Sequence, residues 1–151
     1  MIKFRFSYES LLEHRKLEEE VARRDFNEAF RLLEEQKEKY RKLYAMLHGA
    51  EAESFTLQGS PERVQISKLI ELNDFMAGQK IKIAKQREIV INHTQIVEGK
   101  QDILINAAKE TMILEKLKEK QYGAYKKAVA KKEAKLTDEI VVMRFKGGGR
   151  V

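Results

Sequence analysis

The sequence predicts an all-α protein, an elongated antiparallel two-helix coiled coil with an overhanging C-terminal helix. Three observations predict this class. Ala, Glu, Lys, Arg and Leu supply about half of the 151 residues, and 36% of the residues are charged, a composition typical of long helices and coiled coils. The single proline leaves too few turn residues for a β-sandwich or barrel, and the absence of cysteine excludes a disulfide-stapled secreted domain. The third observation is a seven-residue repeat of apolar positions.

A first helix is expected over residues 7–48. Ser7 can cap it, and Phe6 and Leu11 are spaced as a hydrophobic staple. One register then holds for five heptads, with steps alternating between three and four residues, which indicates a left-handed coiled coil. The predicted seam is Leu12, Arg15, Glu19, Ala22, Phe26, Ala29, Leu33, Gln36, Tyr40, Leu43 and Leu47.

The heptad pattern stops at Gly49, so residues 49–60 are expected to form a hairpin loop. A second helix is expected over 61–143, with Ser60 as its cap and Pro61 at its first position. Residues 1–143 then form one helical hairpin domain, and 144–151, with three consecutive glycines, a disordered tail. The predicted second seam is Leu69, Met76, Ile83, Arg87, Val90, Thr94, Val97, Gln101, Leu104 and Ala108. Beyond Ala108 the register drifts as in a stutter, toward Met112, Leu114, Leu117, Tyr125, Ala128 and Leu136.

The two expected helices have unequal lengths. At 1.5 Å per residue the first extends about 60 Å and the second about 125 Å, so the first can pair with only half of the second. Residues 115–151 carry 11 basic and 5 acidic residues, which accounts for the whole net charge of +6. The overhanging segment is therefore expected to be basic.

Several function classes are disfavoured. The longest apolar run, 140–143, is far shorter than the roughly 18 residues of a membrane span, and residues 1–6 contain no signal-peptide core, so we expect a cytoplasmic protein. His14, His48 and His93 lack a second ligand at metal spacing, and the glycine run lacks the strand and helix of a phosphate-binding loop. We therefore expect no enzymatic activity, cofactor or metal.

Three stretches remain as candidates for partner binding. The lysines of the C-terminal helix form either a solvated face or a surface for an acidic protein or nucleic acid. The second helix carries more apolar residues than one seam uses, and Phe75 is the expected anchor of any second face. Phe4 and Phe6 either pack on the second helix or help to form a binding tip. The lysines are Lys116, Lys118, Lys120, Lys126, Lys127, Lys131, Lys132 and Lys135.

Both ends of the chain resemble a known family. The start, with Lys3-Phe4-Arg5-Phe6 and later Glu18-Glu19-Glu20 and Ala22-Arg23-Arg24, is similar to the N-terminus of the FliJ family of flagellar type III export proteins. The stretch 114–120, with Lys132-Glu133, Asp138-Glu139 and Arg144-Phe145, resembles the C-terminal signature of that family. The likeness extends over nearly the whole chain in matching order.

The resemblance implies a non-enzymatic stalk or chaperone-like component of flagellar export, and with it a role in motility. It implies insertion into the hexameric export ATPase, contact with the cytoplasmic domain of the export gate, and traffic with export chaperones at the inner face of the membrane. The matching gate contacts are Phe75, Gln79 and Gln86. The matching ATPase contacts are Phe4, Phe6, Arg15, Lys131, Lys132, Lys135 and Arg144.

Two other functions stay open from the residues. The stalk protein of a virulence injectisome has the same expected architecture. A basic coiled-coil nucleic-acid binder would use the lysine helix, although lysine offers poorer bidentate recognition of phosphate than arginine does. We therefore expect protein partners, no nucleic acid and no integral membrane segment.

Overall fold

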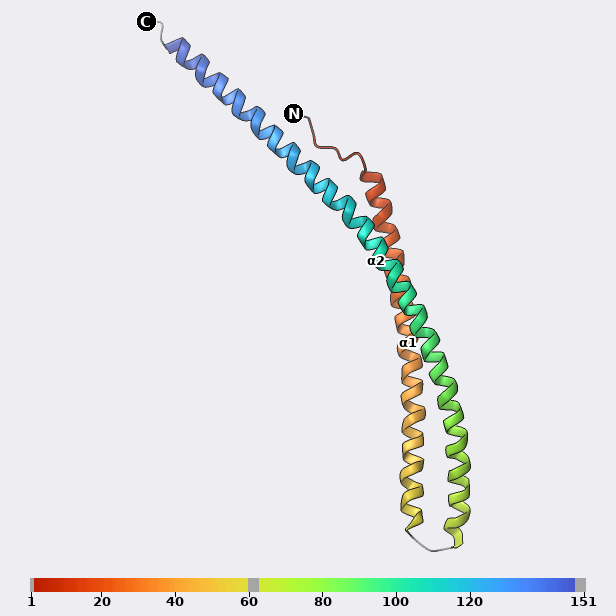
Figure 1. Ribbon diagram of the computed structural model, residues 1–151. Coiled ribbons are helices and arrows are strands. Elements are labelled where there is room, and N and C mark those ends of the chain that lie inside the picture. Colours follow the sequence, from red (N-terminus) through yellow and green to blue (C-terminus); the bar gives the residue numbers. More distant parts are fainter. Residues whose placement is uncertain (1, 60–62, 149–151) are drawn as a thin grey trace. The chain divides into compact units, whose positions relative to one another are not determined.

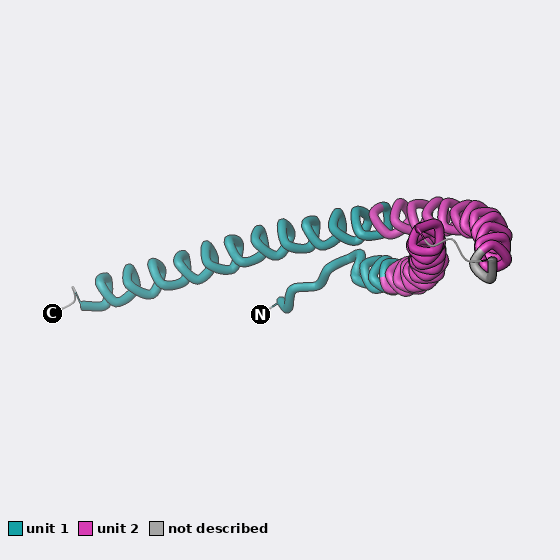
Figure 2. The backbone as a smooth tube through the Cα atoms, turned by 90° about the horizontal axis from the view of Figure 1, so that it is seen from below, with its two compact units in different colours: residues 1–19, 106–151 teal, residues 20–105 magenta. Residues whose placement is uncertain are grey.

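The computed structural model describes residues 2–59 and 63–148, which form two helices, α1 (Glu9–Gln58) and α2 (Arg63–Gly148), with no strand among them (Figure 1). The prediction of an all-α protein built from two helices packed against each other is confirmed. The chain divides into two compact units. Unit 1 contains residues 1–19 and 106–151, and unit 2 contains residues 20–105 (Figure 2).

α1 begins two residues later than predicted. Its first residue is Glu9, and the carbonyl of Tyr8 accepts a hydrogen bond of 2.8 Å from the amide of Leu12. Tyr8 therefore occupies the capping position that the sequence assigned to Ser7. The amide of Glu9 donates to the carbonyl of Phe6 at 3.3 Å, which continues the backbone into the first turn.

The predicted loop over 49–60 is replaced by helix as far as Gln58. Ala50 and Ser54 are buried and Leu57 is half-buried, so the seam continues beyond Leu47 with the same steps of three and four residues. A glycine inside a helix costs only about 1 kcal/mol relative to alanine, and this burial offsets the cost of Gly49. The hydroxyl of Thr56 donates to the carbonyl of Ala52 at 2.9 Å, within the helix.

α2 is continuous through its internal glycines and reaches Gly148. Residues 144–148, predicted to be part of a disordered tail, are helical. The predicted cap at Ser60 and first helical position at Pro61 lie outside the described residues. None of the described helices is long and apolar enough to cross a membrane.

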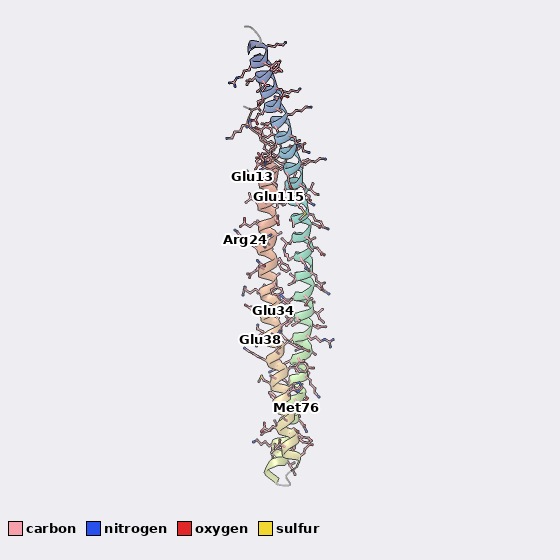
Figure 3. All side chains as sticks on the ribbon, turned by 90° about the vertical axis from the view of Figure 1, so that its left-hand side faces the viewer. Glu13, Arg24, Glu34, Glu38, Met76 and Glu115 are labelled. Atoms are coloured by element: carbon pink, nitrogen blue, oxygen red, sulfur yellow. The ribbon has the colours of Figure 1, made fainter. Side chains whose placement is uncertain are left out.

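Within unit 2, α1 and α2 lie side by side and run antiparallel (Figure 3). Two contacts between the helices show that they are antiparallel: Lys68 pairs with Glu53 at 3.6 Å, and Gln86 bonds to Gln36. As the residue number rises along α2, the number of the contacted residue on α1 falls. All eleven predicted seam positions of α1 are buried or half-buried, as the heptad pattern predicted. The apolar centre of this unit is Ala29, Leu33 and Val97, with Phe26 and Val90 packed against it.

The seam of α2 was predicted only in part. Leu69, Met76, Ile83, Val90, Val97 and Leu104 are buried or half-buried as predicted. Between them the structure buries Gln86 and half-buries Lys100, whereas the predicted Arg87 and Gln101 are exposed. Both members of each pair are polar, so hydropathy could not distinguish them.

The stutter predicted after Ala108 is absent. Thr111 is buried and Met112 is exposed, and the spacing of seven residues continues along α2 through Lys118 and Tyr125, both half-buried. Thr111 tolerates burial because its hydroxyl donates to the carbonyl of Ala107 at 3.1 Å within the helix. Because methionine is more hydrophobic than threonine, a hydropathy pattern selects Met112 and not Thr111 as the seam residue.

Candidate partner-binding surfaces

The N-terminal segment of unit 1 packs on α2 through aromatic side chains. The ring of Phe4 lies 5.1 Å from that of Tyr122 and 5.5 Å from that of Tyr125, measured between centroids, within the range of favourable aromatic pairs. The hydroxyl of Tyr125 donates to the carbonyl of Ile2 at 2.6 Å. These contacts fix the extended residues before α1 onto α2.

Phe6 and Arg15, both predicted contacts of the ATPase ring, are also occupied within unit 1. Phe6 is buried, and the ammonium of Lys118 lies 6.0 Å from its ring centroid. Lys118 also pairs with Glu9 at 2.8 Å. The guanidinium of Arg15 pairs with Glu18 at 3.0 Å and with Glu110 on α2 at 2.8 Å. Phe6 therefore holds the N-terminal segment in place, and Arg15 joins the two helices.

The remaining predicted ATPase contacts share an exposed stretch of α2. Every residue of α2 from Lys131 to Gly148 is exposed, including Lys132, Lys135 and Arg144. None of these cations takes part in an ion pair within residues 2–59 and 63–148. Residues 126–148 contain seven lysines and arginines against three acidic residues. This stretch, which we call the basic end, presents unneutralised positive charge to solvent.

An open apolar groove lies where the N-terminal segment reaches the basic end. Its volume is about 430 Å³. Ile2 forms one wall and α2 supplies the other residues: Tyr125, Ala128, Val129, Lys132, Glu133 and Leu136. The groove is lined by apolar residues together with one lysine and one glutamate, and it can therefore accept an apolar side chain.

The three residues predicted to contact an export gate lie in different environments of unit 2. Phe75 is 41% exposed, whereas Gln79 and Gln86 are only 2% and 9% exposed. The Nε2 of Gln79 donates to the carbonyl of Leu43 at 2.9 Å. The Nε2 of Gln86 donates at 2.9 Å to the carbonyl of Gln36 and at 2.8 Å to its Oε1. Both glutamines are thus bonded to α1, and of the three residues only Phe75 is exposed to solvent.

The three histidines do not gather into a site. His14 lies 3.0 Å from Glu18 and His48 lies 3.3 Å from Glu51, each one turn along its own helix. Over the part of the chain that the structure describes, no group of three or more His, Cys, Asp and Glu residues is arranged to hold a metal ion.

The sequence reasoning missed one apolar feature of the basic end. Leu136, Ile140 and Met143 are exposed on α2, whereas the heptad pattern predicted Leu136 as a seam residue and the other two belonged to a short apolar run. Their spacing of four and three residues was the available signal, because it repeats that of the buried seam.

The family described as "Flagellar FliJ protein" matches residues 4–150, which is nearly the whole chain. Neither the curated proteins nor the solved structures yield a match.

Proposed function

This chain belongs to the flagellar FliJ family, and from that premise we propose that it is a non-enzymatic stalk of the flagellar type III export apparatus. The family places its role in flagellar protein export. In the proposed mechanism, the basic end inserts into the ring of the export ATPase and couples the cycle of the ring to delivery of export substrates. The protein supplies binding energy to the ring and performs no chemistry itself.

The observation that supports this proposal is the unneutralised charge of the basic end. Lys131, Lys132 and Lys135 are exposed, although Lys132 also lines the groove that Ile2 borders. Clustered cations of this kind accelerate association with an acidic surface and fix its orientation. Phe4 and Phe6 contribute indirectly, because they anchor the N-terminal segment beside this surface.

The test is stimulation and ring assembly of the cognate flagellar export ATPase. The variant K131E/K132E/K135E changes the charge by −6 and is expected to abolish both effects at physiological salt. The matched control, K80E/K82E/K85E, makes the same charge change at three exposed positions of unit 2 and is expected to behave as wild type. If the first variant stimulates and assembles the ring as wild type does, the basic end is not the ATPase contact.

For the export gate, we assign the contact to Phe75, which is exposed on α2. Gln79 and Gln86 are excluded from a direct contact as long as their amides remain bonded to α1. The variant F75A is expected to weaken binding to the cytoplasmic domain of the gate by tenfold or more, an order typical of an aromatic anchor. I103A, a truncation at another exposed position of α2 in unit 2, serves as the control, and equal effects of the two would refute the assignment.

Export chaperones are the third proposed class of partner, and the proposed location is the cytoplasmic side of the membrane at the flagellar base. Both follow from the export role of the family. Fluorescent tagging in a motile cell tests the location. Foci that coincide with flagellar bases are expected, and uniform cytoplasmic signal would contradict it.

A further inference from the structure

The face of α2 that packs in unit 1 continues along the basic end. Tyr125 is half-buried on this face. At 100° per residue, Val129, Leu136, Ile140 and Met143 fall within an arc of about 60° that includes Tyr125. These four residues, which we call the terminal stripe, therefore extend the helix-packing face by about 20 Å at 1.5 Å per residue.

The covering of this face ends within the stripe. Val129 is half-buried in the groove that Ile2 borders. Leu136, Ile140 and Met143 are 58%, 54% and 72% exposed. The same face that buries apolar surface at Tyr125 thus presents apolar surface to solvent about three to five turns later.

The charge around the stripe selects the kind of partner. Lys132 and Glu133 lie between Val129 and Leu136 along the helix, and Glu139 precedes Ile140. Over the whole basic end, however, lysines and arginines outnumber acidic residues seven to three, which gives a net charge of +4. Two such surfaces repel each other, so a second copy of this chain is a poor occupant. An acidic segment is attracted by the same charge.

The spacing of the stripe selects the conformation of the partner. Side chains four, seven, four and three residues apart from Tyr125 onward present the ridges and hollows that a second helix fills in a coiled coil. An amphipathic helix lies in such a groove through residues at i, i+3, i+4 and i+7. A flexible loop has no matching repeat of side chains and would contact fewer residues of the stripe.

We propose that the terminal stripe receives an acidic amphipathic helix from a partner protein, which packs along α2 as a continuation of the two-helix packing. This inference rests on the proposed function, because it names the chemistry of the segment that binds at the basic end. Apolar residues of the partner helix pack on Leu136, Ile140 and Met143, and its flanking carboxylates pair with the lysines.

The probe is a synthetic 21-residue peptide with leucine at heptad positions a and d and glutamate at e and g. A second peptide with lysine at e and g has the same apolar face and opposite charge. We expect fluorescence anisotropy with the full chain to give a Kd for the acidic peptide at least about tenfold lower than for the basic one. Circular dichroism should show a gain of helix on mixing.

Two variants of equal charge separate the apolar stripe from electrostatics. L136D/I140D alters the stripe, and V141D/V142D alters neighbouring residues that are 58% and 52% exposed but lie about 120–140° around the helix from Leu136. All four positions are exposed, so neither variant removes a core residue. L136D/I140D is expected to weaken binding of the acidic peptide at least about tenfold, and V141D/V142D less than about threefold.

Three results would overturn the inference. The first is that the acidic peptide does not bind. The second is that both double variants weaken binding equally, which would reduce the interaction to charge. The third is that anionic phospholipid vesicles or duplex DNA bind in a stripe-dependent manner while the peptide does not. The ATPase assay with the lysine variants is independent of this measurement, so failure of the ring contact and failure of the helix contact are distinguishable.

Discussion

Gln86 offers the sharpest test of the helix pairing in unit 2. Gln86→Ala removes two hydrogen bonds to Gln36, each worth about 0.5–1.5 kcal/mol net, and one buried methylene worth about 0.8 kcal/mol. The carbonyl of Gln36 keeps its bond within α1, and Gln36 is only half-buried, so water can bond to its Oε1 in the variant. We expect a loss of about 2–4 kcal/mol in the free energy of unfolding.

The assay is thermal unfolding followed by circular dichroism at 222 nm, supported by urea titration. At about 2–4 °C per kcal/mol for a chain of this size, the expected fall in Tm is roughly 5–15 °C. Gln101→Ala is the control, because Gln101 is exposed on the same helix and its loss is expected to stay within about 0.5 kcal/mol. Equal effects of the two substitutions would refute the burial of Gln86 between the helices.

A double-mutant cycle isolates the pair. Gln36→Ala and Gln86→Ala are measured singly and together, and a coupling free energy of about 0.5–3 kcal/mol is expected for residues in direct contact. The cycle with Gln36 and Gln101 should give no coupling. A null result for the first pair would mean that the hydrogen bond between their side chains adds nothing to stability.

Three further predictions concern local contacts. Tyr125→Phe deletes the donor to the carbonyl of Ile2 and should cost about 0.5–1.5 kcal/mol, measured as a fall in Tm of roughly 1–6 °C; an unchanged Tm would contradict the contact. The hydrogen bond and charge of Arg31 lower the pKa of Glu28, so the contribution of this pair is complete above the ordinary glutamate pKa and is lost as pH falls through the lowered one. Arg31→Gln should raise the pKa of Glu28 in a carboxyl NMR titration, and an unmoved midpoint would refute the pairing. Gly99→Ala should raise stability by about 1 kcal/mol, because a Cβ there meets no atom within 4 Å, and a lower Tm would contradict that open space.

The first seam was predictable because apolar residues and aromatics dominate it. Every position proposed on α1 between Leu12 and Leu47 is buried or half-buried. The second seam was harder to predict because its alternate positions are polar. Choosing Gln86 over Arg87 requires knowing that a glutamine amide meets carbonyls of α1, which is information from the partner helix and not from the local pattern.

The predicted end of the first helix was wrong for a different reason. Gly49 was treated as a stop signal, but the burial of Ala50 and Ser54 outweighs its cost. The candidate site was also predicted only in part, because contacts between distant parts of the chain are not visible in a local pattern. The lysines were found from charge alone, whereas the roles of Phe4 and Phe6 depend on their contacts with Tyr122 and Lys118, more than a hundred residues away in the sequence.

Gln79 uses the main chain of α1 as its acceptor, at the carbonyl of Leu43. An acceptor of this kind exists whatever side chain stands at position 43, so the bond depends on the identity of only one of the two residues it joins. Substitutions at Leu43 therefore change the packing but leave its carbonyl available to Gln79. The alignment of the two helices at this contact tolerates mutation of the α1 residue but not of the α2 residue.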